Sequence, residues 1–174
     1  MRKHLFLITL LCIFVVGCKE TEVIPKQTPD LMLSEHLTLG NPSNATADLN
    51  NPNNFLMEKP QYALSYSRDR GTPNWVSWYL SKDWIGGAPR QDDFRSDLSL
   101  PTNWYKVTAS SYTGSGFDRG HNTPSADRSK TIEDSSATFL MTNMIPQAPN
   151  NNQQTWANLE NYTRDLVQAG NEVT

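Results

Sequence analysis

The stretch of sequence that decides the fold runs from Gly116 to Arg128 and reads GFDRGHNTPSADR. It places His121 directly after what reads as an Asp-Arg-Gly turn, with a proline and a second aspartate close behind. A neutral imidazole, with an ordinary pKa of about 6.5, is a suitable general base near neutral pH. A lone histidine more often has a structural role, so the interpretation of His121 depends on the rest of the chain.

Two further motifs follow on the C-terminal side, NMIPQ at residues 143–147 and NQQTWANLE at residues 152–160. A short strand is predicted over Phe139–Met144 and a helix from about Gln153 to Ala169. The apolar positions of that helix recur at the spacing of one face: Trp156, Leu159, Thr163, Leu166 and Val167. The central motif is therefore followed by a strand and then a long helix.

On the N-terminal side, two aromatic and β-branched runs, Tyr62–Tyr66 and Trp75–Leu80, flank the turn-forming residues 67–74. Such a pattern predicts a β-hairpin. Strands before the motif and a helix after it indicate an α+β domain.

In this order, the motifs resemble those of the DNA/RNA non-specific endonucleases, whose core is a ββα-metal (His-Me) finger. The resemblance covers roughly residues 62–170. It implies a mixed, mainly antiparallel sheet flanked by helices and an enzyme that hydrolyses phosphodiester bonds in both DNA and RNA.

The resemblance also implies roles for individual residues. His121 would be the general base, and Asn152 would be the one side chain bound directly to Mg²⁺, for which Mn²⁺ can substitute. Water and phosphate oxygens would complete the shell, as suits an ion that prefers oxygen ligands. Glu160, within roughly a quarter-turn of Asn152 on a helix, would orient water around the metal. The alternative for Glu160 is an ordinary ion pair with Arg164 one turn on.

Upstream, Pro89–Asp97 resembles the family's arginine-rich segment, in which one arginine stabilises charge on the phosphate. Alignment of its aromatic residue with Phe94 points to Arg90, and Arg95 remains a rival. A guanidinium suits this role because its planar fork meets phosphate oxygens in pairs.

The rest of the motif is expected to support the reaction centre. Asp118 and Arg119 would fix the loop that aims His121, while Gly120 would permit a close backbone turn. Asn143 is expected to line the site. Loop hydrogen bonds and a surface ion pair are the simplest interpretation of Asp127 and Arg128.

The N-terminus reads as a secretion signal, because residues 1–17 carry a basic start and an apolar run of signal-peptide length. Cys18 follows a sequence similar to the lipobox of bacterial lipoproteins, which predicts lipid on Cys18. Residues 18–54 would then be a flexible tether and residues 55–174 the nuclease domain. We expect an extracytoplasmic protein anchored to a membrane, periplasmic or at the cell surface, with no protein partner.

Residue usage narrows the chemistry further. Cys12 and Cys18 are the two cysteines, so a cysteine hydrolase and a cysteine-rich zinc site are excluded in the domain. His4 falls in the leader and His36 in the expected tether, which leaves imidazole chemistry to His121. The net charge of −3 requires any basic footprint for nucleic acid to be local.

Two alternatives stay open. One is a non-catalytic surface lipoprotein that binds glycan or nucleic acid through aromatic residues such as Trp75, Trp78 and Tyr79. The other concerns the C-terminus: the family domain usually continues into a further strand where this sequence stops, at residues 171–174, so either the sequence is a fragment or this member is unusually short.

Overall fold

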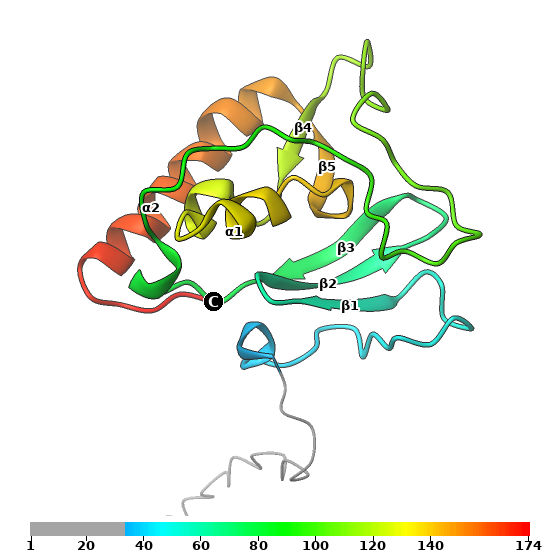
Figure 1. The fold of residues 1–174 in the computed structure, drawn as a ribbon, viewed down its shortest axis with the longest axis horizontal. Helices are drawn as coiled ribbons and strands as arrows, with labels where there is room; N and C mark the ends of the chain where they lie inside the picture. Colours follow the sequence, from blue (N-terminus) through cyan, green and yellow to red (C-terminus); the bar gives the residue numbers. More distant parts are fainter. Residues whose placement is uncertain (1–33) are drawn as a thin grey trace, which may run out of the picture. The chain divides into compact units, whose positions relative to one another are not determined.

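The computed structural model describes residues 34–174, so the expected leader and Cys18 lie outside the described part. Its first sheet is antiparallel, in the order β1 (Phe55–Lys59), β2 (Tyr62–Ser67) and β3 (Thr72–Ser77) (Figure 1). All six residues of β2 are buried, as expected of a central strand. The turn between β2 and β3 contains Gly71 at φ +67°, a conformation that favours glycine. The predicted hairpin is confirmed.

The second ladder pairs β4 (Asp118–His121) with β5 (Met144–Gln147) in antiparallel register, so that Asp118 faces Gln147 and His121 faces Met144. The central motif is therefore a strand, and the expected Asp-Arg-Gly turn is wrong. The strand predicted over Phe139–Met144 begins only at Met144, because a 3₁₀ turn occupies Met141–Asn143.

Gly120 does not have the positive φ of a tight turn. A glycine is needed there because the Gln147 side chain lies very close to its backbone. A Cβ added there would lie 2.6 Å from the Cβ of Gln147 on β5, closer than packed side chains allow. The glycine lets the Gln147 side chain cross over β4.

Two helices complete the domain, α1 (Ile132–Ala137) and α2 (Ala157–Gln168). Thr131 begins α1, because its hydroxyl accepts a hydrogen bond from the Asp134 amide. A π-helical segment, Asn151–Trp156, leads directly into α2. The predicted helix is confirmed, but its first turns are wider than those of an α-helix. Among residues 34–174, no helix is long and apolar enough to cross a bilayer.

The packed domain extends further toward the N-terminus than expected. Residues 34–54 contain the 3₁₀ turn Glu35–Leu37, and the side chains of His36, Leu37 and Ala45 are buried. Thr46 forms a β-bridge to Phe55. Residues 34–54, which were expected to form part of the flexible tether, therefore belong to the same compact unit as residues 55–174.

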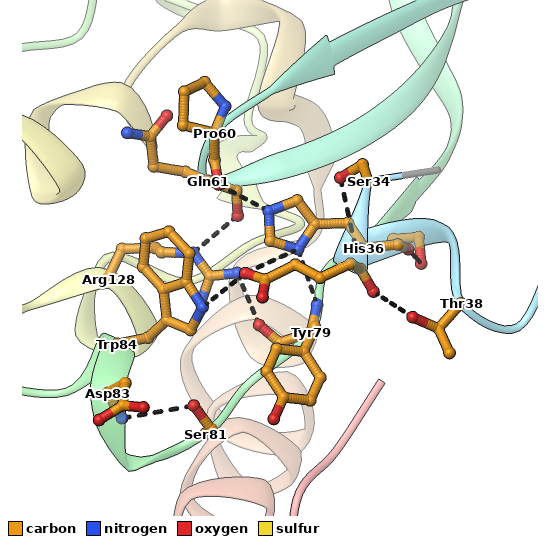
Figure 2. A network of polar contacts seen from close by, with 12 residues as sticks. Ser34, His36, Thr38, Pro60, Gln61, Tyr79, Ser81, Asp83, Trp84 and Arg128 are labelled. Carbon is orange, nitrogen blue, oxygen red and sulfur yellow. Dashed lines mark hydrogen bonds and ion pairs between the residues drawn. The ribbon is translucent and has the colours of Figure 1, made fainter. Parts of the chain in front are cut away.

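His36 is buried in a polar network that ties this N-terminal segment to the sheet (Figure 2). Its Nε2 lies 2.7 Å from the Pro60 carbonyl oxygen, and its Nδ1 accepts a hydrogen bond from the Tyr79 amide at 3.1 Å. The indole of Trp84 donates to Glu35. Both imidazole nitrogens are thus satisfied in the neutral form, which gives His36 a structural role within the domain.

Arg128, in the same network, is fully buried and forms no surface ion pair, contrary to expectation. Its guanidinium donates to the carbonyls of Gln61, Tyr79 and Asp127 and packs 4.3 Å over the Trp84 ring. Burial lowers the pKa of Arg128 to about 10, which leaves it charged at neutral pH. The charge is held by carbonyl dipoles and an aromatic face.

The apolar core has two parts. The larger surrounds β2 and consists of Met57, Tyr62, Leu64, Tyr66, Leu100 and Trp104. The smaller lies by β5 and consists of Val107, Met141 and Met144, with Phe94 and Tyr112 packed against it. Met144 of this cluster pairs with His121 across the β4–β5 ladder, and Phe94 packs against the His121 ring, so the cluster supports His121.

Candidate active site

A cavity of about 160 Å³ collects most of the residues singled out from the sequence. Its polar lining comes from four separate segments and comprises Arg90, Arg119, His121, Ser125, Asn152 and Glu160. β4 supplies His121, and the helix that begins at the π segment supplies Asn152 and Glu160. The cavity thus combines a candidate base, two guanidinium groups and the side-chain oxygens of Asn152 and Glu160. The ββα unit and one upstream loop bring these groups together.

His121 is almost completely buried at the end of β4, with 8% of its surface exposed. The rings of Phe94 and Phe139 pack edge-on against the imidazole, at centroid distances of 5.6 and 4.8 Å. Burial, reinforced by the charge of Arg90, lowers the pKa of His121 to about 3. The imidazole is therefore neutral at physiological pH, and its Nε2 has no hydrogen-bond partner among the described residues.

Asn152 is held from one side only. Its amide nitrogen donates to Asp118 Oδ2 at 2.9 Å, and Gln153 Nε2 donates to the same oxygen at 2.9 Å. These two hydrogen bonds lower the pKa of Asp118. Asp118 on β4 thus fixes the amide of Asn152 in the π-helical segment, which orients the metal-ligand candidate rather than a loop. Gln153 was not predicted from the sequence, although its position next to Asn152 was an available signal.

Glu160 lies in the same cavity as His121, and burial raises the pKa of its carboxyl to about 7. The expected alternative, an ion pair with Arg164, does not form. Arg164 instead donates to Asp127 Oδ1 at 2.7 Å and to Asn161. Asp127 is fully buried and also accepts a hydrogen bond from the Trp78 indole at 3.0 Å, so it anchors α2 from behind the site.

The two candidate arginines are placed differently. Arg90 lines the cavity, donates to Ser125 Oγ at 3.1 Å and stacks 4.8 Å over the Phe139 ring. Arg95 pairs with Asp93 and donates to the Ser136 carbonyl, and it does not line the cavity. The structure brings Arg90, and not Arg95, to His121.

Arg119 reaches the cavity as well, with its guanidinium carbon 3.8 Å from the centre of the Phe94 ring. Phe94 and Phe139 therefore support both cavity arginines and the histidine. No role in the site was predicted for Phe94 or Phe139 from the sequence. Phe94 and Phe139 contact β4 from distant parts of the chain, so no local sequence pattern reveals these contacts.

Asn143 does not line the cavity, contrary to expectation. It is fully buried, and its side chain donates to the carbonyls of Thr123 and Thr138 and accepts from the Thr123 amide. All of its side-chain hydrogen-bonding groups are used, so Asn143 fixes the chain just beyond His121.

Comparison with known proteins agrees with this geometry. A family model described as "DNA/RNA non-specific endonuclease" matches residues 40–174. A nuclease of Nostoc sp. (strain PCC 7120) is 54% identical over 168 residues, covering 95% of this chain and 61% of that protein. Human mitochondrial endonuclease G is 37% identical over 117 residues, covering 66% of this chain and 39% of that protein.

A solved structure of an EndoG/EndoGI complex shares the fold, with a TM-score of 0.65 and 25% sequence identity. The match covers 76% of this chain and 52% of that one. The chain thus spans between about two fifths and three fifths of the length of these relatives. The family match, the α+β fold and the convergence of His121, Asn152 and Glu160 lead to one conclusion: the chain belongs to the DNA/RNA non-specific endonuclease family.

Proposed function

We propose that this protein is a metal-dependent endonuclease that hydrolyses DNA and RNA without sequence preference. The observation that carries the proposal is the neutral His121 imidazole, which belongs to a residue that lines a cavity with two arginines. A neutral base beside positive charge is what phosphodiester hydrolysis requires. Non-specificity fits a site that contacts phosphate rather than base edges.

In the proposed reaction, the His121 imidazole takes a proton from a water molecule as that water attacks phosphorus. The bond from phosphorus to the 3′-oxygen breaks, and the leaving oxygen takes a proton from a second water molecule. Arg90 and Arg119 stabilise the negative charge that develops on the phosphate oxygens. Both guanidinium groups are already stacked on aromatic rings, so little reorganisation is needed when the phosphate binds. Glu160 would accept hydrogen bonds from water in the cavity and orient it.

The residues present fit a hard divalent cation such as Mg²⁺. Asp118 holds the amide nitrogen of Asn152, while no described residue donates to the amide oxygen, which is the type of ligand Mg²⁺ prefers. Residues 34–174 contain no cluster of three or more His, Cys, Asp or Glu that could hold a metal, so an ion at Asn152 would keep most of its waters. When bound, it would supply positive charge for the leaving oxygen.

The test is plasmid and RNA cleavage by the purified protein with Mg²⁺ or Mn²⁺. EDTA should abolish cleavage, and His121→Ala should lower kcat by a factor on the order of 10²–10⁴, the usual contribution of a general base. His36→Gln is the matched control, because His36 lies in the structural network of Figure 2. Full activity of His121→Ala would reject the mechanism.

Localisation is part of the same proposal: lipid on Cys18 would hold the nuclease on the outer side of a membrane. Support comes from the sequence alone, because Cys18 lies outside the described residues. Labelled palmitate should be incorporated into the protein and lost in Cys18→Ser. Label that persists in Cys18→Ser, or never appears, would reject the anchor.

The non-catalytic alternative required an exposed platform of aromatic residues on β3 and directly after it. Trp75 and Trp78 are instead partly buried, and their indole nitrogens donate to Ser43 and Asp127. Their hydrogen bonds connect β3 and the residue directly after it to the rest of the domain, which favours a structural role over glycan binding.

A further inference from the structure

A second, larger cleft of about 460 Å³ adjoins the cavity of His121. The two spaces share Arg90, Arg119 and Asn152 as lining residues. The proposed chemistry uses these shared residues but assigns no role to the part of the larger cleft that Phe117 and Tyr112 line. Its volume falls within the range of small-molecule binding sites, so it is large enough for part of a substrate that extends beyond the reacting phosphate.

The cleft carries an aromatic ring that the core does not use. Phe117 lines it with 50% of its surface exposed, directly before Asp118 in the chain. The preceding loop is locally fixed: Gly114 and Gly116 have φ values of +73° and +81°, and the Phe117 amide donates to Ser115 Oγ. Single exposed aromatic residues are common on protein surfaces. Phe117 is distinguished by its place in a cleft that reaches the reaction centre.

The chemistry of the lining suits a nucleobase. Phe117, Tyr112 and the guanidinium of Arg119 all line this cleft, and aromatic rings and guanidinium planes both stack on bases. Arg119 is held in place by its own stacking on Phe94. Because every base has a π-face, stacking provides affinity without sequence preference.

We propose that the larger cleft holds the nucleoside next to the scissile phosphate, with Phe117 stacked on its base. The inference rests on the proposed nuclease function and specifies which part of the substrate the protein binds. A base held there would bring the neighbouring phosphate to Arg90 and Arg119, which line both spaces.

The test compares two single-stranded DNA oligonucleotides of equal length, one with normal bases and one built from abasic tetrahydrofuran residues. Binding to the purified protein is measured in EDTA by fluorescence anisotropy, and cleavage is measured with Mg²⁺. Phe117→Ala should raise Kd and KM for the normal oligonucleotide about tenfold, the size of one lost stacking contact. We expect kcat to stay within about twofold and abasic binding to be unchanged.

Two variants control the result. Phe117→Trp should keep wild-type affinity, because it keeps an aromatic face. Tyr162→Ala removes a ring that is 60% exposed on α2 and lines neither space, so it should change nothing. Unchanged Kd in Phe117→Ala, or equal weakening for both oligonucleotides, would overturn the stacking role. A wild-type protein that binds bases through Phe117 but cleaves neither DNA nor RNA would refute the nuclease function and leave only the base stacking by Phe117 standing.

Discussion

At the scale of single residues, Gly120 shows that the pairing of two strands can depend on the absence of one side chain. Because the Gln147 side chain lies over Gly120, any larger residue must push β4 and β5 apart. His121 comes next on β4, so a displacement at Gly120 is passed directly to the proposed base.

We therefore expect Gly120→Ala to destabilise the protein by about 1–3 kcal/mol, the usual cost of overpacking, and to lower cleavage activity. Gly87→Ala is the matched control, since a Cβ at Gly87 has no heavy atom within 4 Å. Urea unfolding measures the first effect and plasmid cleavage the second. Equal stability of the two variants would contradict the role given to Gly120.

At the scale of secondary structure, the π-helical segment Asn151–Trp156 aligns the two oxygen donors of the site. Eight residues of regular α-helix would leave Asn152 and Glu160 about 80° apart around the axis. A π turn contains more residues, so each residue advances through a smaller angle. The wide segment therefore brings Asn152 and Glu160 closer to one face, and both line the same cavity.

The Asp127–Arg164 ion pair sets the position of this helix against the rest of the site. The carboxylate is fully buried and the arginine is 19% exposed. A double-mutant cycle with Asp127→Asn and Arg164→Gln should give a coupling energy of about 2–3 kcal/mol, as for interacting buried groups. The exposed pair Arg68–Asp69 should give less than about 1 kcal/mol. Similar couplings in the two cycles would show that the buried pair does not hold α2.

The ordering of elements was predictable from the sequence, and long-range side-chain contacts were not. Hydrophobic alternation indicated the β2–β3 hairpin, and helical spacing indicated α2. Arg128 appeared to be a surface residue, because its acceptors at Gln61 and Tyr79 are 67 and 49 residues away in the chain. Family motifs identified His121 and Asn152. The aromatic support from Phe139 left no such signal.

At the scale of the whole molecule, His36 makes stability depend on pH. Burial lowers the pKa of His36 below its ordinary value of 6.5 in the folded protein. The unfolded chain therefore binds a proton that the folded protein does not, and the contribution of His36 is complete above pH 6.5 and is lost as pH falls below it.

Urea unfolding of the wild type should show a free energy that declines from pH 7.5 to pH 5. His36→Gln should be less stable at pH 7.5 but decline less steeply, by up to about 1.4 kcal/mol per pH unit, the linkage of one proton. His121 contributes in the same direction, so some slope should remain. Parallel curves for the two proteins would show that His36 is not the titrating group.

Because residues 34–54 pack onto the domain, they cannot lengthen the connection between the domain and a membrane. If Cys18 carries lipid, only residues 19–33 separate the membrane from the first described residue, and fully extended they span at most roughly 50 Å. A free tether to residue 55 would span more than twice that distance. The proposed nuclease would then act only in a thin layer next to the membrane. Nucleic acid held farther away on a rigid spacer would escape cleavage, whereas freely diffusing strands would be cleaved.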